Sequence, residues 1–174
     1  MQSSNIHGMN IDQLEKNIER VQGWIKNADD KVSILLAFDG LYFVLFVEKA
    51  ISRIRDAVSH QAEEIIVLYG AATFFLLWSL IKALISIYPR LKHNHQTRSV
   101  LYFSDIAAQT FSDFSKAVAG SSATKYKEDL TRQIYSCSIV ATRKFNAFKD
   151  ALILTALSLT LFGLTAICQR GLSL

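Results

Sequence analysis

The sequence has only one proline and two cysteines among its 174 residues. Because Pro89 is the single proline, long helices can form on either side of it without interruption. Two cysteines, Cys137 and Cys168, cannot build a disulfide framework, and no Cys or His spacing matches a zinc site. All four histidines lie outside the apolar stretches, which disfavours a haem held between membrane helices. We expect no metal and no cofactor.

Sequence motifs of common catalytic sites are also missing. The chain has no glycine-rich phosphate loop, no nucleophile elbow and no paired carboxylates in a plausible pocket. A formal net charge of +4 is too small to indicate a nucleic-acid partner. The sequence therefore favours a protein that is not an enzyme, and we predict no catalytic residue.

Apolar residues are concentrated in three long runs separated by charged segments. The runs are Val32–Val47, Ile65–Tyr88 and Ala151–Cys168, of 16, 24 and 18 residues. About 20 mostly apolar residues carry a helix across the roughly 30 Å hydrocarbon layer. The first run is short and contains Asp39, but flanking side chains can snorkel and a bilayer can thin. We expect an all-α membrane protein with three transmembrane helices.

The basic residues between the runs indicate an orientation. Residues 1–31 hold four Lys or Arg, residues 48–64 three, residues 89–150 ten, and residues 169–174 one. Three spans place residues 1–31 and 89–150 on one side, with fourteen basic residues against four. The positive-inside rule puts that side in the cytoplasm, with an external loop at 48–64 and an external tail at 169–174.

Two amphipathic helices are predicted to run from the cytoplasm into the membrane. Asn10 and Gln13 have the spacing of a capping box. The first seam then steps by three and four residues through Ile11, Leu14, Ile18, Val21, Ile25, Ala28 and Val32. The second consists of Leu130, Ile134, Cys137, Ala141, Phe145, Phe148 and Leu152. We expect a parallel cytoplasmic stalk in which Ile11 lies beside about residue 130 and Ile25 beside about residue 144.

The segment 89–124, between the second run and the second seam, is irregular. It contains the basic cluster Arg90, Lys92, His93, His95 and Arg98, then LYFSDIA, a short helix capped by Thr110 with Asp113, and a loop at 119–124. The simplest interpretation of the cluster is contact with anionic lipid. The alternative is a phosphate anchor beside Tyr102 and Phe103, whose rings can stack on a base.

Two charges lie inside the apolar runs. Asp39 is about 10 Å and Lys82 about 9 Å from the cytoplasmic ends of their runs. The first two spans form an antiparallel hairpin, so the depths coincide and we expect an intramembrane charge pair. The alternative is that Lys82 snorkels and Asp39 is partly protonated.

Further charges mark the membrane boundary. Asp29 and Lys31 flank the first seam there, level with Arg143, Lys144 and Lys149 on the partner helix. We interpret Asp29 as part of a structural salt bridge that holds the stalk at the bilayer surface. The alternative is that these groups belong to a ligand-sensing region or couple it to the spans.

Three motifs follow one another along the chain. They are WIKNADDKVSILLAFDG at residues 24–40, LYFSDIA at residues 101–107 and DLTRQIYSCSIVATRKFNAFKDA at residues 129–151. In order and spacing they resemble the motifs of the Pycsar membrane-effector family over roughly residues 11–165. The matching positions are Ala28, Asp29, Lys31, Tyr102, Phe103, Asp129, Gln133 and Lys144. Val32 stands where that family usually has alanine, and Asp30 adds an acid.

The resemblance implies an anti-phage effector of the bacterial inner membrane. In that family a companion nucleotide cyclase makes cyclic CMP or cyclic UMP on infection, and the effector senses it and damages the membrane, which causes abortive infection. The alternative is a constitutive membrane scaffold or a holin-like toxin without nucleotide control. We also expect a homo-oligomer.

A cyclic nucleotide presents one negative charge and one flat base. Its pocket should therefore contain one or two basic groups and an aromatic ring. The candidates are Arg98, Tyr102 and Phe103 in the middle segment, and Trp24 and Lys31 on the stalk.

Overall fold

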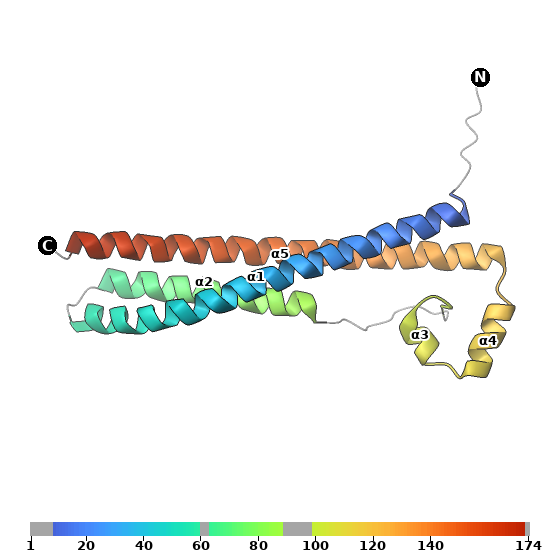
Figure 1. Cartoon of the computed structure of the whole chain (residues 1–174), viewed down its shortest axis with the longest axis horizontal. Helices are drawn as coiled ribbons and strands as arrows, with labels where there is room; N and C mark the ends of the chain where they lie inside the picture. Colours follow the sequence, from blue (N-terminus) through green and yellow to red (C-terminus); the bar gives the residue numbers. More distant parts are fainter. Residues whose placement is uncertain (1–8, 60–62, 89–98, 173–174) are drawn as a thin grey trace, which may run out of the picture. The chain divides into compact units, whose positions relative to one another are not determined.

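The computed structural model describes residues 9–59, 63–88 and 99–172. It contains the helices α1 (Ile11–Ser59), α2 (Glu63–Ile87), α3 (Phe103–Ala107), α4 (Phe111–Ala119) and α5 (Ala123–Leu172). Within these ranges no strand occurs, which confirms the all-α expectation. Figure 1 shows the two long helices, α1 and α5, and the shorter helices that lie between them in the sequence.

The chain divides into two compact units. The first comprises Met1–Lys26 and Pro89–Thr142, and the second comprises Asn27–Tyr88 and Arg143–Leu174. Both α1 and α5 contribute a segment to each unit. The predicted boundaries at residues 31 and 150 therefore lie a few residues away from the structural division.

In the first unit, the beginnings of α1 and α5 pack together. The predicted capping box is confirmed: Asn10 N donates to Gln13 Oε1 at 3.0 Å, and Gln13 N donates to Asn10 Oδ1 at 2.8 Å. The predicted seams supply the buried apolar residues of this unit, namely Leu14, Val21, Leu130 and Ala141. The side chains of Glu15 and Tyr126 join the two helices through a hydrogen bond of 2.9 Å.

Two short helices complete the first unit. The cap of α4 is the predicted one, because Thr110 Oγ1 accepts from Asp113 N at 3.2 Å. The motif LYFSDIA forms α3, with Tyr102 immediately before its first residue. At the start of α5, Ser122 Oγ accepts from Lys125 N at 3.2 Å. The loop expected at residues 119–124 is therefore reduced to the three residues between α4 and α5.

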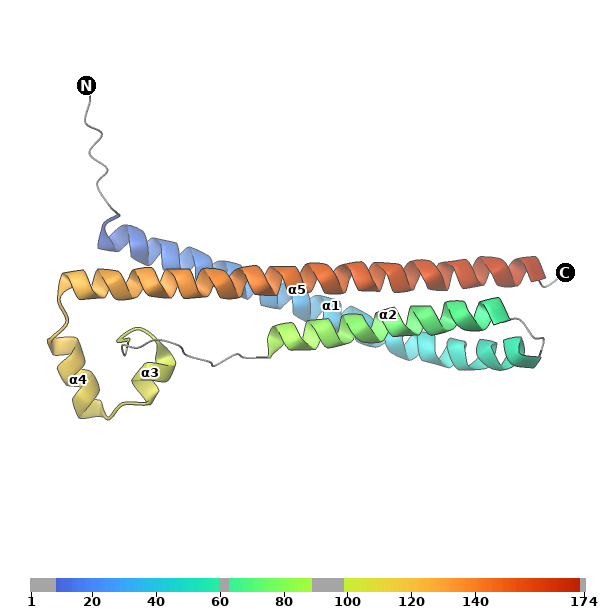
Figure 2. The same ribbon diagram turned by 180° about the vertical axis from the view of Figure 1, so that it is seen from behind.

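The second unit is a three-helix bundle, seen from two sides in Figures 1 and 2. Its contacts join Tyr42 of α1 to Ser158 of α5, and Asp39 to Thr155. The residue numbers of the two partners increase together along the helices, so α1 and α5 are parallel. Ser79 of α2 contacts Ala151 and Asp39, and Ala72 contacts Ser158, so α2 is antiparallel to both.

The second unit places apolar side chains on its outer surface. Exposed residues of its helices include Ile34, Leu41, Val44, Phe74, Trp78, Leu84, Leu157 and Ile167. Its buried positions include Asp39, Ser79, Thr155, Ser158 and Thr165 beside small and apolar residues. An exterior this rich in large apolar side chains is not typical of a water-soluble helical bundle, and it suits a hydrocarbon surrounding.

Two helices among the described residues are long and apolar enough to cross a membrane, α2 and the part of α5 up to Cys168. Only 28% and 22% of the two apolar stretches are buried, whereas the core helices of a soluble protein are mostly buried. The first run does not qualify by composition, because Asp39 lies inside its 16 residues and Lys31 and Glu48 bound it.

Three sequence expectations need correction. The segment predicted as an external loop, residues 48–64, is mostly helical, because α1 continues to Ser59 and α2 begins at Glu63. Leu152 is not on the seam but 47% exposed, and its neighbour Ala151 is buried instead. Equal membrane depth places Ile25 beside about residue 144, but in the structure Asp29 lies beside Lys144. The register is set by the side chains that contact one another, and it differs by about one helical turn from that expected from equal membrane depth.

Candidate functional site

A buried polar cluster lies at the centre of the second unit. The side chain of Asp39 is 0% exposed and receives hydrogen bonds from Ser79 Oγ at 2.7 Å and Thr155 Oγ1 at 2.9 Å. Ser79 Oγ also lies 2.9 Å from both the carbonyl oxygen of Ala151 and Thr155 Oγ1. One carboxyl group therefore links all three helices. In an apolar surrounding such groups fix the helix register, because a shifted register would leave them unpaired.

A second polar contact lies one turn further along α1 and α5. The hydroxyls of Tyr42 and Ser158 are 3.4 Å apart, and Ser158 Oγ donates to the carbonyl oxygen of Ala72 at 2.8 Å. The ring of Tyr42 also contacts Phe46 and Phe162, with ring centroids 5.6 and 6.2 Å apart. This contact continues the polar interior toward an aromatic end of the bundle.

The structure corrects the expected pair of Asp39 and Lys82, since each has a different partner. Lys82 Nζ lies 3.4 Å from Asp150 Oδ2, and both side chains are partly exposed. Ser79, one turn before Lys82, faces the carboxyl group instead. The sequence held a signal for this, because continuing the three-and-four steps of the first seam beyond Val32 reaches Asp39.

Asp29 and Lys144 form the expected structural salt bridge within the second unit. Lys144 Nζ contacts Asp29 Oδ1 and also donates to the carbonyl oxygen of Ser86 at 3.2 Å. The three groups come from α1, α5 and α2, so this contact closes one end of the bundle. Beside it, Lys31 Nζ lies 5.6 Å from the ring centroid of Phe145.

The first unit contains a hollow of about 380 Å³. It is lined by Val100, Leu101, Val118, Ser121, Ser122, Ala123 and Tyr126. Ser121 Oγ is buried and has no hydrogen-bond partner among the described residues. The size of the hollow is at the lower end of the range for small-molecule sites.

Tyr126 connects this hollow to α1. Its phenol donates to the Glu15 carboxylate, and this bond, with a smaller effect of burial, raises the pKa of Tyr126 above its ordinary value of 10.0. Burial similarly raises the pKa of the Cys137 thiol further along α5. Both side chains are therefore uncharged at neutral pH and add no charge to the first unit.

Two carboxylates hold the segment that enters α3. Asp129 Oδ2 accepts from Ser99 Oγ at 2.8 Å and from Val100 N at 3.0 Å. Asp105 Oδ2 accepts from Ser99 N at 2.8 Å. Asp129, which belongs to the third motif, therefore fixes one wall of the hollow. Asp105 was not among the predicted site residues, although it lies in the motif LYFSDIA, two residues after Phe103.

The predicted ligand residues are not gathered in this hollow. Tyr102 and Phe103 follow its wall directly, with ring centroids 5.0 Å apart, and Phe103 is 64% exposed. Trp24 is exposed on the α1 segment of the first unit, whereas Lys31 belongs to the second unit. Arg98 and the basic cluster before it lie outside the described residues. Among the described residues no group of three His, Cys, Asp or Glu could hold a metal ion.

The comparison with known proteins supports the family resemblance of the three motifs. Residues 13–169 match the Pycsar effector protein domain, which covers most of both structural units. No curated protein and no solved structure matches the chain. Because the match extends over far more than half of the sequence, the chain belongs to the Pycsar effector family.

Proposed function

We propose that this anti-phage effector senses a cyclic pyrimidine nucleotide, cyclic CMP or cyclic UMP, in the bacterial cytoplasm and then impairs the inner membrane. The family match across residues 13–169 is the observation that carries this proposal. The two units provide a physical basis for it, because one has a hollow with an unpaired hydroxyl and the other has an apolar exterior. A binding role of this kind requires no catalytic residue.

We propose that α1 is the third membrane span, in addition to α2 and α5. Asp39 disfavoured this in the sequence, but its carboxyl group is buried and hydrogen-bonded inside the bundle. The lipid-facing side of the run instead carries residues such as Ile34, Leu41 and Val44. The cost of a polar group is therefore met within the protein.

Three spans give a testable orientation. With fourteen basic residues on one side and four on the other, the amino terminus and residues 89–150 face the cytoplasm and Leu174 faces outward. A carboxyl-terminal alkaline phosphatase fusion should be active and a fluorescent-protein fusion dark. The reverse pattern would overturn this orientation of three spans.

The nucleotide site that we propose is the hollow of the first unit. Ser121 Oγ and the hydroxyl of Ser122 can donate to a phosphate, and the ring of Tyr126 offers a face to a base. Tyr102 and Phe103 directly follow the lining residue Leu101 in the sequence and offer a second aromatic surface. Arg98 remains a candidate for the charge and Trp24 for a further ring, whereas Lys31 belongs to the second unit.

Binding must favour one arrangement of the long helices to affect the membrane. Both α1 and α5 pass from the first unit into the second without a break in helical structure. At these two junctions the described residues are helical and form no loop that would absorb a rotation or a slide. A nucleotide that binds one arrangement of the stalk more tightly shifts its population accordingly.

Calorimetry on the purified protein in detergent tests the sensing step. Cyclic CMP or cyclic UMP should bind, and cyclic AMP much more weakly. Ser121→Val should weaken binding about tenfold, because it fills the hollow and removes the hydroxyl. Ser115→Val, on an exposed face of α4, is the matched control and should change nothing.

Two further measurements decide between the proposal and its alternative. Alanine variants of Trp24, Lys31, Arg98, Tyr102 and Phe103 locate the contacts, and unchanged binding in all five would exclude these residues. Vesicles carrying the protein should leak a trapped dye only when the pyrimidine nucleotide is added. Leakage without any nucleotide would favour the constitutive toxin.

A further inference from the structure

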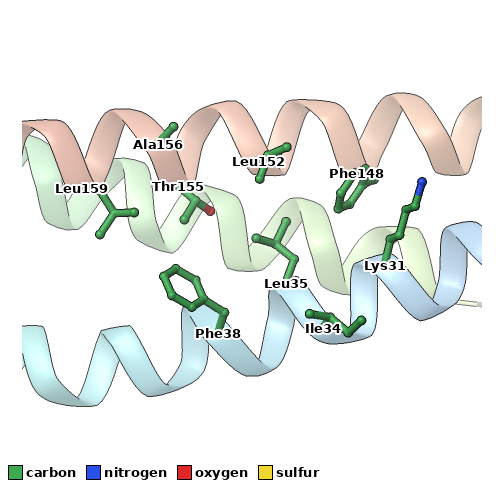
Figure 3. Close-up of a pocket in the computed structure, with 9 residues that line it drawn as sticks. All are labelled: Lys31, Ile34, Leu35, Phe38, Phe148, Leu152, Thr155, Ala156 and Leu159. Carbon is green, nitrogen blue, oxygen red and sulfur yellow. The ribbon is translucent and has the colours of Figure 1, made fainter.

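A groove of about 380 Å³ lies between α1 and α5 of the second unit. It is lined by Lys31, Ile34, Leu35, Phe38, Phe148, Leu152, Thr155, Ala156 and Leu159 (Figure 3). Every lining side chain except those of Lys31 and Thr155 is apolar, and Thr155 uses its hydroxyl inside the bundle. Ile34, Phe38 and Leu152 are largely exposed, so the groove opens to the surroundings of the bundle.

We propose that this groove binds one anionic phospholipid, with an acyl chain along its apolar walls and the phosphate at Lys31. Figure 3 shows Lys31 at one end, and Phe38 and Leu159 at the other. Lys31 directly precedes the first apolar run, where a span would meet the headgroup layer. The positive charge and the apolar walls therefore lie in the order of a lipid's headgroup and tail.

The length of the groove also fits a lipid tail. From Phe148 to Leu159 the lining extends over twelve residues of α5, which are separated by a rise of about 16 Å. Half of the roughly 30 Å hydrocarbon thickness is about 15 Å, the depth of one leaflet. The groove therefore accommodates a chain of the leaflet in which Lys31 lies, and anionic lipids are concentrated in the cytoplasmic leaflet.

The charge of Lys31 is available for a phosphate. The neighbouring carboxylate of Asp29 is already bound by Lys144. The described residues give Lys31 no carboxylate partner, and its ammonium lies over the ring of Phe145 at 5.6 Å. This ring contact positions the cation without neutralising it. The inference rests on the proposed membrane topology, and because Lys31 is also a candidate contact of the nucleotide, the lipid measurements are made without nucleotide.

Native mass spectrometry of the delipidated protein in detergent tests the proposal. With phosphatidylglycerol added, we expect one retained lipid per chain, and with phosphatidylcholine about fivefold less retention, since one basic residue near the surface has about that effect. Lys31→Gln should abolish this preference. Lys149→Gln is the charge control and should keep the preference for phosphatidylglycerol. Lys149 is an exposed lysine just before the third apolar run, as Lys31 is before the first.

A second pair of variants tests the apolar walls. Ala156→Phe fills the groove and should remove the retained lipid, whereas Ala166→Phe, on an exposed face outside it, should not. Equal losses in the Lys31 and Lys149 variants would overturn the proposal, as would a lipid retained by Ala156→Phe. A dimer that Ala156→Phe converts to monomer would identify a second copy of the chain as the occupant instead. All these measurements are made without nucleotide. A negative result would therefore not contradict the proposal that the protein senses a cyclic nucleotide.

Discussion

In the second unit, Asp39, Ser79 and Ser158 are fully buried while isoleucine, leucine and phenylalanine side chains cover the surface. In the first unit, Leu14, Val21 and Leu130 are buried, and most of the charged residues of α1 and α5 are exposed. The exposed surface of the same two helices therefore changes from largely charged to largely apolar on passing from the first unit to the second. One uninterrupted helix can serve two solvents, because the side chains and not the backbone decide which surrounding is favourable.

The two units also use carboxyl groups differently. Asp105 and Asp129 accept hydrogen bonds from backbone N–H groups and so shape a loop. Among the described residues, Asp39 accepts hydrogen bonds from the side-chain hydroxyls of two other helices and so links their register.

A charge on the surface of each unit gives the sharpest contrast. Leu157→Arg places a cation on the exposed apolar face of α5, at a cost of about 2.5–3.5 kcal/mol for a site within the hydrocarbon. Tyr135→Arg makes a similar change on an exposed position of the first unit and should cost almost nothing. Membrane-fraction yield and thermal unfolding in detergent measure the difference. If Leu157→Arg is tolerated as well as Tyr135→Arg, that face does not lie in lipid.

Removing a hydroxyl from the buried cluster should have the next largest effect. Thr155→Val keeps the side-chain shape but removes a donor to Asp39, so the bundle should lose about 1–2 kcal/mol. Thr160→Val is the control, because Thr160 is exposed and bonds only its own helix through Ala156. Unfolding by denaturing detergent compares the two. Equal stability would mean that Asp39 does not depend on this contact.

In the first unit the bond between Tyr126 and Glu15 should contribute about 1 kcal/mol. Because the pKa of Tyr126 is raised on folding, its stabilising effect is complete below pH 10 and is lost as the pH rises through the pKa of the folded protein. Tyr126→Phe should lower stability at neutral pH and weaken the alkaline decline. Tyr135→Phe, an exposed tyrosine, should retain both. A steeper alkaline decline in Tyr126→Phe would contradict the assignment.

The salt bridge at one end of the second unit should have the smallest effect. Asp29 and Lys144 are only partly buried, so a double-mutant cycle of Asp29→Asn and Lys144→Gln should give a coupling energy of about 0.5 kcal/mol. Addition of salt should reduce it. A coupling of zero in low salt would leave the carbonyl of Ser86 as the relevant partner of Lys144.

Much of the local structure could be predicted because it depends on neighbouring residues. The capping box of Asn10 and Gln13 and the cap at Thr110 involve residues three apart, so their spacing is sufficient. The seam from Leu14 to Val32 follows from helical periodicity in the same way. A pocket between residues 89–124 and the stalk was expected from the sequence, but the lining of the hollow could not be predicted, because it joins residues 100–101 to residues between 118 and 126.

The helical character of this chain, the membrane-length apolar stretches of α2 and α5 and the motifs shared with the Pycsar effectors follow from the order of the amino acids. That Asp39 bonds Ser79 and Thr155 while Lys82 bonds Asp150 follows from the packing of the three helices. Composition and periodicity act within one helix, and the sequence reveals them directly. A partner on another helix depends on register and rotation, which many side-chain contacts set together, and one helical turn is enough to exchange one partner for another.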